Sequence, residues 1–426
     1  MEPEANFASR RLDALAAKVF APAAGLGVLG LAGSAGLGAA AGWDRFFQSY
    51  LVAFLFVLSI ALGALFFTFI KHLTRAGWSV VLRRILEALG ANLSWLWVLF
   101  VPLLLVVVLG HGEMLYHWAD TEHAAHDELL QHKAPYLNTG FWAIRAIVYL
   151  AVWAVAGEFF FRLSTAQDRT GDVHLTKRMQ RWSPVIAVLF ALTQTFAAVD
   201  WIKSLEPHWF STMFGVYFFA ASTCGVIATL CLVMYGLQRA GKLEAEITQE
   251  HYQDVGKMLF AFGIVFWAYI AFSQYMLIWY ANIPEETMWY LARQLGPWLW
   301  VSVVLLLGHF LVPFVLLLSK HPKRIKPVLA GFGAWMLLMH YLDLYWLVMP
   351  QVPADAMYAA TSYAALADGV ASGEVDVGFE PHMLDVTTVV VMAGVFVAMT
   401  VRRLRACALI PVQDPRLHES LAFENM

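Results

Sequence analysis

The chain has 426 residues, of which 60% are hydrophobic and only 14% are charged, and its mean hydropathy is +0.63. A soluble domain has about 45–50% apolar and about 25% charged residues, so water cannot be the solvent for most of this chain. The composition excludes a cytosolic enzyme and a disordered scaffold. A net charge of -3 offers no basic surface, so no nucleic-acid partner is expected.

Ten apolar segments are long enough to cross a bilayer as helices, which takes about 20 residues each. They predict an all-α integral membrane protein with a cytoplasmic N-terminal segment at 1–20, a transmembrane helical domain at 21–401 and a cytoplasmic tail at 402–426. Two long outer loops are expected at 110–140 and 349–385. The ten expected spans are 21–42, 47–70, 93–109, 141–161, 184–202, 210–235, 258–280, 297–318, 328–348 and 386–401.

The distribution of basic residues predicts the orientation of these spans. With the N-terminus inside, 23 of the 28 Lys and Arg residues fall in inner segments and 5 in outer ones. This excess is typical of cytoplasmic loops, so both termini are expected in the cytoplasm. The N-terminus starts acidic and lacks a signal-peptide pattern, so no cleavage is expected. Residues 77–93 (GWSVVLRRILEALGANL) predict an amphipathic helix that lies on the membrane surface.

Three motifs fail on their context. Residues 25–30 fit the dinucleotide pattern GxGxxG but lie inside an apolar run, where small residues favour close helix packing and would suit docking against another subunit. The three cysteines form no CxxC pair, so neither an iron–sulfur site nor a zinc site is expected. The outer loop carries five histidines at spacings that match no compact metal motif, so a solvated or partner-facing loop is favoured: His111, His117, His123, His126 and His132.

Ionisable and polar residues in or beside the spans are the candidates for function, because a charge in hydrocarbon is costly. Deep histidines and carboxylates fit either a proton path or a quinol pocket. Ion pairs that fix helix register are the alternative, and the spacing of Asp200 and Lys203 suits such a pair. The candidates are Arg145, Glu158, Asp200, Lys203, Gln274, Glu285, Glu286, His309, His340 and Asp343. No catalytic residue and no metal ligand is assigned.

Three long runs carry a resemblance to a known family. They are residues 200–217 (DWIKSLEPHWFSTMFGVY), 274–287 (QYMLIWYANIPEET) and 309–314 (HFLVPF). Together they resemble the NrfD-like (polysulfide reductase C-type) membrane subunits, and within them the ActF-type subunits of bacterial alternative complex III. The resemblance covers roughly residues 45–405.

The resemblance implies two four-helix bundles with flanking helices, in the cytoplasmic (inner) membrane of a bacterium. It implies a subunit of a quinol:cytochrome c oxidoreductase that binds quinone, commonly menaquinone, or conducts protons, and that holds no haem or iron–sulfur cluster itself. The implied partners are a second NrfD-like subunit, a periplasmic iron–sulfur subunit, multihaem and monohaem cytochromes c, and lipids. The sister subunit, with His and Asp near its outer surface, is the better candidate for the main quinol pocket. Asp200, Lys203 and Glu206 stand in the corresponding region here.

Within this family, the placement of the candidates predicts a buried polar path. His309, His340 and Asp343 are expected to form its deep part, and Asp200 with the loop carrying Glu285 and Glu286 its outer exit. Two other functions stay open. A secondary transporter would use the same residues as an ion path, and a haem-b anchor would use His309 and His340 as ligands.

Overall fold

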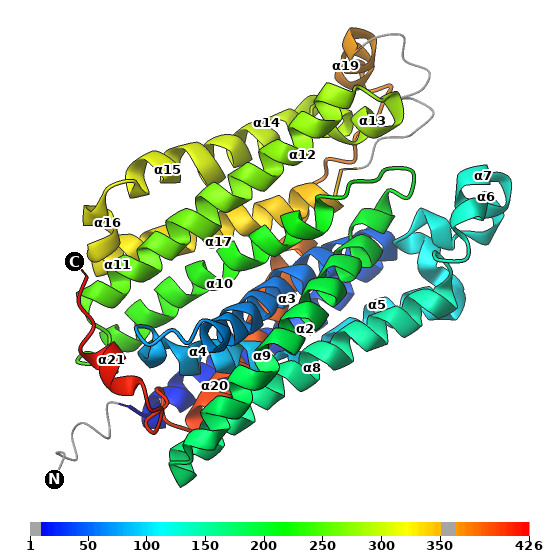
Figure 1. The fold of residues 1–426 in the computed structure, drawn as a ribbon. Helices are drawn as coiled ribbons and strands as arrows, with labels where there is room; N and C mark the ends of the chain where they lie inside the picture. The colour runs from blue at the N-terminus through cyan, green and yellow to red at the C-terminus, as the bar shows by residue number, and fades with distance from the viewer. Residues whose placement is uncertain (1–9, 351–362, 426) are drawn as a thin grey trace.

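The computed structural model describes residues 10–350 and 363–425, and within these ranges it contains helices and no strand (Figure 1). Ten described helices are long and apolar enough to cross a membrane, which confirms the expected number and makes the chain a multi-pass membrane protein. They are Leu15–Ala41, Trp43–Leu73, Val80–Met114, Thr139–Thr170, Val173–Leu205, Phe214–Arg239, Gln249–Ala281, Gly296–Leu317, Lys326–Val348 and Met383–Arg405. Each overlaps one of the expected spans, mostly with longer ends.

Eight of these helices pack as two groups of four. The first group consists of α3 (Trp43–Leu73), α5 (Leu93–Val106), α8 (Thr139–Thr170) and α9 (Val173–Trp201). The second begins with α10 (Phe214–Arg239) and ends with α17 (Lys326–Val348). Between these two, α11 (Gln249–Met258), η5 (Leu259–Phe266) and α12 (Trp267–Ala281) form one continuous rod, and α14 (Gly296–Val304), η6 (Leu305–Leu311) and α15 (Val312–Leu317) form another.

The two remaining long helices, α2 (Asp13–Ala41) and α20 (Met383–Arg405), pack against each other and against α3. Gly27 and Gly30 of α2 lie at this contact, where an added Cβ would come within 2.8 Å of Val395 and 2.7 Å of Val391. The GxGxxG pattern therefore serves close helix packing, as expected. The partner in this contact is α20 of the same chain.

Helix α3 joins the two groups, because it packs against α9 on one side and against α10 and α17 on the other. Its contact with α10 requires a glycine. A Cβ on Gly63 would lie 2.3 Å from the backbone oxygen of Ser222 and 2.7 Å from the side chain of Val226. Neither helix can move away without opening the junction between the groups.

We expect Gly63→Ala to lower the free energy of unfolding by about 1–3 kcal/mol, because an extra methyl group must displace backbone in a packed interior. Thermal unfolding can be followed with a thiol-reactive fluorophore, which gains access to the buried Cys224 and Cys231 when the bundle opens. Gly25→Ala is the matched control, since nothing lies within 4 Å of an added Cβ there. Equal stability of the two variants would contradict this account of the α3–α10 contact.

The prediction of a surface helix at residues 77–93 is wrong in its placement. Helix α4 (Val80–Ala91) forms as expected, but all twelve of its residues are buried between α3, α8 and the C-terminal segment. Its arginines form ion pairs inside the protein, Arg84 with Glu87 and Asp168, and Arg83 with Asp414. Carboxylates of the chain therefore take the place that lipid headgroups would have at the membrane surface.

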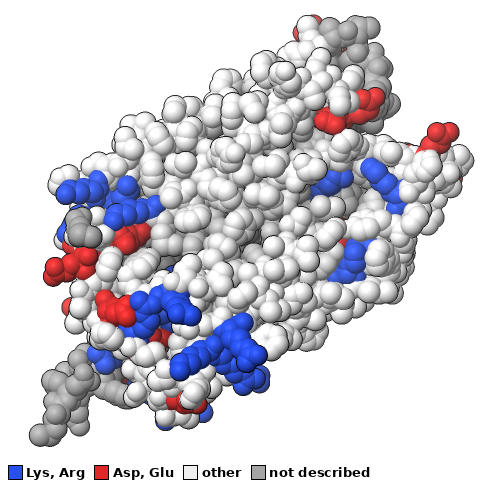
Figure 2. Space-filling view, in the orientation of Figure 1, with Lys and Arg blue, Asp and Glu red and all other residues white. Residues whose placement is uncertain are grey.

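Charged side chains gather at the two ends of the long helices, with a wide, nearly uncharged band between them (Figure 2). On the visible face, Lys and Arg are concentrated at the end where both chain termini lie (Figures 1 and 2). This distribution matches the preference of charges for water and of the apolar band for hydrocarbon. It also leaves the few charges between the helices as the exceptions to explain.

Candidate functional site

Arg145 and Asp200 form a buried ion pair in the first helix group. Arg145 donates from Nε and Nη2 to the two carboxylate oxygens of Asp200, at 2.7 and 2.9 Å. The hydroxyl of Tyr149 donates to the same carboxylate at 2.8 Å, and the guanidinium lies 3.8 Å from the ring centre of Tyr136. Arg145 rather than Lys203 is therefore the cation that pairs with Asp200, and the expected Asp200–Lys203 pair is wrong. The two-point geometry of a guanidinium explains the choice.

Glu158 belongs to a second internal ion-pair network. Its carboxylate accepts from Arg403 of α20 at 2.6 Å, from Arg162 one turn along α8 at 3.0 Å, and from the hydroxyl of Ser94 at 2.9 Å. These contacts tie α8 to α20 and α5. Arg145 and Glu158 therefore both form internal ion pairs, the alternative to a functional role that the sequence left open.

Three outer candidates do not converge on a common site. Glu285 is exposed and Glu286 half-buried in the first turn of α13 (Pro284–Ala292), and neither lines any of the cavities described below. Gln274 is buried, and it accepts from Ser211 at 3.0 Å and donates to the hydroxyl of Tyr290 at 3.1 Å. Gln274 therefore positions Tyr290, an aromatic residue of the site described next.

Asp343 is fully buried within the second helix group, and its partners are neutral. One carboxylate oxygen accepts from the hydroxyl of Tyr217 at 2.5 Å, and the other accepts from the indole Nε1 of Trp267 at 3.1 Å. No Lys, Arg or His within the described ranges forms an ion pair with it. Asp343 thus differs from Asp200, whose charge is balanced by an arginine.

His309 and His340 lie in the same helix group and contact adjacent residues of α10, Cys224 and Gly225. His309 stacks on Trp267, with 3.8 Å between ring centres and 2° between planes, and its Nε2 is 3.2 Å from the carbonyl oxygen of Gly263. His340 Nε2 is 2.7 Å from the hydroxyl oxygen of Ser59. The Ser59 hydroxyl donates its own proton to the backbone carbonyl oxygen of Phe56. The Nε2–H of His340 must therefore be the donor in the contact with Ser59.

The second ring nitrogen of each histidine is unused. Nδ1 of His309 and Nδ1 of His340 are buried and have no hydrogen-bond partner in the described part of the chain. With Nε2 protonated in both rings, each Nδ1 carries a free lone pair. Each Nδ1 is therefore an unused hydrogen-bond acceptor inside the helix group.

A large aromatic groove reaches this cluster from the outer surface of the helices. It has a volume of about 760 Å³ and lies between α12 and the α14–α15 rod. Tyr269, Phe272 and Leu306 on its rim are each more than half exposed, so the groove opens sideways toward the membrane. Its lining also includes Tyr217, Trp267, Tyr275, Tyr290, Ser302, Phe310, Phe314 and Trp346.

The inner wall of the groove holds the two donors to Asp343. Tyr217 and Trp267 line the groove and bond the carboxylate at the same time, so the carboxylate lies one side chain behind the wall. His309 is stacked behind the same Trp267. A ligand seated in the groove would thus lie against the side chain of Tyr217, whose hydroxyl is bonded to a buried carboxylate, within otherwise apolar and aromatic surroundings. This combination is typical of sites that orient one polar group of an apolar ligand.

Lys203 lines a small polar cavity near the outer ends of the helices, together with Glu206, His117 and Arg293. Arg293 is almost fully buried, lies 3.5 Å over the ring of Trp289, and donates to three backbone carbonyl groups. Burial lowers the pKa of Arg293 to about 9, against the opposing effect of Glu206. Burial also raises the pKa of the Glu206 carboxyl, against the opposing effects of Arg293 and the nearby histidines.

The raised pKa of Glu206 predicts a pH dependence of stability. Because the folded form binds this proton more tightly than the unfolded chain does, the stabilising contribution is fully present below the ordinary carboxyl pKa and is lost as the pH rises through the raised value. Glu206→Gln removes the titration, so the variant is expected to lose less thermal stability than the wild type as the pH rises above the ordinary carboxyl pKa. Glu285→Gln, which changes an exposed acid, is the control. Equal pH dependence of the wild type and Glu206→Gln would contradict the prediction.

Several residues of the site carry no signal in a single sequence. Tyr217 and Trp267 are ordinary aromatic residues of apolar helices, and only the fold reveals that both point at Asp343. The π-helical segments η5 and η6 of this helix group also carry no signal in the sequence. They meet where His309 bonds the carbonyl of Gly263, and such segments often accompany functional sites. Arg293 carries one available signal in the sequence, an arginine between Trp289 and Trp298.

The outer-loop histidines do not gather into a metal site. Among the described side chains, which leave out that of His123, no three His, Cys, Asp or Glu residues lie close enough together to hold a metal ion. His117 lines the small polar cavity, and His126 bonds the backbone of its own short helix. The comparisons with known proteins add no further evidence: no family model matches the chain, and no curated protein matches it significantly.

Proposed function

We propose that the chain is an NrfD-like membrane subunit of a quinol:cytochrome c oxidoreductase of the alternative complex III type, and that it binds quinol in the aromatic groove beside Asp343. The observation that carries this proposal is the joint placement of the groove and of Tyr217, which lines it and donates to the buried carboxylate. Menaquinol is the expected substrate. The resemblance of the three sequence runs described above supports the same assignment.

The chemistry of a quinol fits the groove. A quinol has a flat aromatic head with two hydroxyl groups and a long apolar tail, and it reaches the groove through the hydrocarbon. Tyr217 can accept a proton from a quinol hydroxyl as it passes its own proton to Asp343. Oxidation of quinol releases two protons and two electrons, and the electrons would pass to the iron–sulfur and cytochrome c subunits of the complex.

The unused Nδ1 atoms of His309 and His340 support a proton path that continues from Asp343 along α10. Asp343 and His340 are one turn apart on α17, while His309 packs against Trp267, which bonds Asp343. Asp200 and Glu158 are less suited to this role, because each is held by an arginine. This revises the predicted outer exit at Asp200. The region of Glu206 and Lys203 replaces it in the proposal.

The orientation follows from the charges. We place both termini in the cytoplasm of a bacterium and the groove's outer end, with Tyr275 and Tyr290, toward the periplasm. The support is the 23:5 division of Lys and Arg and the collection of basic side chains at the end that carries the termini (Figure 2). On this side the iron–sulfur and cytochrome partners would dock. A haem-b anchor receives less support, because Nε2 of both deep histidines already contacts protein groups.

Photoaffinity labelling tests the proposal. An azido-menaquinone analogue added to membranes that contain the assembled complex is expected to label peptides of α10, α12 and α14 of this chain, and excess menaquinone should suppress the labelling. The groove between α8 and α9, which contains no carboxyl or hydroxyl side chain, provides an internal control. Labelling confined to other subunits, or to α8 and α9, would overturn the assignment of the site.

A further inference from the structure

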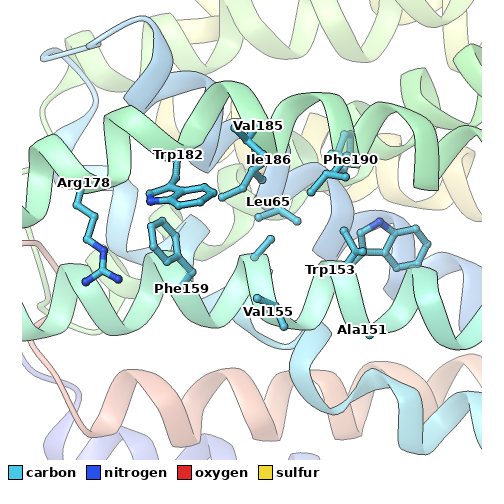
Figure 3. Close-up of a pocket in the computed structure, with 13 residues that line it drawn as sticks. Leu65, Ala151, Trp153, Val155, Phe159, Arg178, Trp182, Val185, Ile186 and Phe190 are labelled. Carbon is cyan, nitrogen blue, oxygen red and sulfur yellow. The ribbon is translucent and has the colours of Figure 1, made fainter.

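The structure contains a second, chemically different groove on another face of the molecule. It lies between α8 and α9, with Leu65 of α3 at its floor, and has a volume of about 500 Å³ (Figure 3). Such a volume is within the range of about 300–1,000 Å³ of small-molecule sites. Trp182 and Phe159 lie beside each other toward one end, and Trp153 lies toward the other (Figure 3).

The groove opens sideways and is almost entirely apolar. Val155 on its rim is 70% exposed. Among its lining residues the only charged one is Arg178, which extends past the end formed by Trp182 (Figure 3). The indole Nε1 of Trp153 is engaged, since it donates to Thr193 at 2.8 Å. The groove therefore suits a long apolar chain whose one polar group, an anion, lies at the Arg178 end.

Arg178 is available to bind such an anion. Within the described residues it forms no ion pair and no side-chain hydrogen bond, and it is exposed. Lys177 and Arg181 are its neighbours on α9, and both are exposed and equally without an ion pair in the described ranges. Arg178 lines the groove, and the two neighbouring cations add positive charge to the same part of α9, within five residues of Trp182. Tryptophan is enriched at the depth where lipid headgroups lie.

The acids of α8 and of the turn that precedes α9 are already engaged elsewhere. Glu158 pairs with Arg403, and Asp168 pairs with Arg84. Asp172 accepts from the backbone at the first turn of α9 as its N-cap. None of them neutralises Arg178, so its charge is left for a ligand from outside the chain.

We propose that the groove between α8 and α9 binds an anionic diacyl phospholipid, with one acyl chain along the groove and the phosphate at Arg178. Basic pockets between transmembrane helices on the cytoplasmic side are known to hold lipid headgroups, and each such cation contributes modestly. The apolar lining retains the acyl chain of the lipid, and the cations favour a lipid with an anionic headgroup. This site is independent of the proposed quinol site, because the two grooves share no lining residue.

Native mass spectrometry of the full chain tests the selection of charge. The detergent-solubilised protein is incubated with phosphatidylglycerol or with phosphatidylcholine of the same acyl chains. The wild type is expected to retain phosphatidylglycerol preferentially, and Arg178→Gln to lower this preference about fivefold. Arg169→Gln removes another exposed arginine, at the C-terminal end of α8, that does not line the groove, and should keep the preference. No preference in the wild type, or an equal loss in Arg169→Gln, would overturn the proposal.

A second variant tests the position of the acyl chain. Val155→Trp fills the groove from its exposed rim and leaves Arg178 in place, so it is expected to lower the retention of both lipids. Because Val155 faces outward, the substitution does not disturb the core, and thermal unfolding should be unchanged. If the filled groove retained both lipids as the wild type does, the acyl chain could not lie between α8 and α9.

Discussion

Asp343→Asn is expected to slow quinol oxidation by the assembled complex about 10²- to 10⁴-fold, the range that a positioned general base contributes. Asparagine preserves the size of the side chain and can still accept from Tyr217 or Trp267, but it cannot take up the proton of a quinol hydroxyl. The measurement is steady-state reduction of the cytochrome c acceptor by a menaquinol analogue. Quinone retention should be nearly unchanged, since the groove walls are intact.

The matched control comes from the other helix group. Tyr217→Phe and Tyr149→Phe each remove one hydroxyl that donates to a buried aspartate, at 2.5 Å from Asp343 and 2.8 Å from Asp200. Only Tyr217→Phe should slow turnover, because only Tyr217 lines the aromatic groove. Equal rates in wild type, Asp343→Asn and Tyr217→Phe would refute the assignment of Asp343. Equal slowing by both tyrosine variants would point to a purely structural effect.

Arg145→Gln is expected to destabilise the fold by about 3–5 kcal/mol, because it leaves the Asp200 carboxylate buried without a cation. The variant also removes the guanidinium from its place against Tyr136. The shift in thermal unfolding can be followed with the thiol-reactive dye that reports access to Cys224 and Cys231.

The double variant Arg145→Gln/Asp200→Asn separates the ion pair from simple packing. The double variant contains no buried carboxylate without a cation, because position 200 is then a neutral asparagine. It should therefore be more stable than Arg145→Gln alone. Strictly additive losses would show that the two side chains do not interact in the way that their two hydrogen bonds suggest.

The spans were predictable from the sequence because hydropathy is a local property. A run of about 20 apolar residues identifies a transmembrane helix whatever it packs against. The buried position of α4 was not predictable in the same way. An amphipathic helix with two arginines and a glutamate fits a lipid surface as well as a protein interior. The carboxylates that decide between these, Asp168 and Asp414, lie about 80 and 330 residues further along the chain.

The candidate site was predictable in its ionisable members and not in its shape. Asp343, His309 and His340 stand out because charges and imidazoles are rare in apolar helices. Their neighbours do not stand out, since Tyr217 and Trp267 are two aromatic residues among many. The cation that pairs with Asp200 was not predictable from local spacing. The spacing favoured Lys203, three residues further along the chain, but the fold brings Arg145 of another helix to the carboxylate. Grooves arise from the packing of several helices, and no local pattern encodes them.

The most direct test of the central claim is a cryo-electron microscopy map of the whole complex with menaquinone or a quinol-site inhibitor bound. We predict density for the ring in the groove between α12 and α14, with one ring oxygen within hydrogen-bond distance of the Tyr217 hydroxyl. A map in which the ring occupies only another subunit, while this groove contains lipid alone, would contradict the claim.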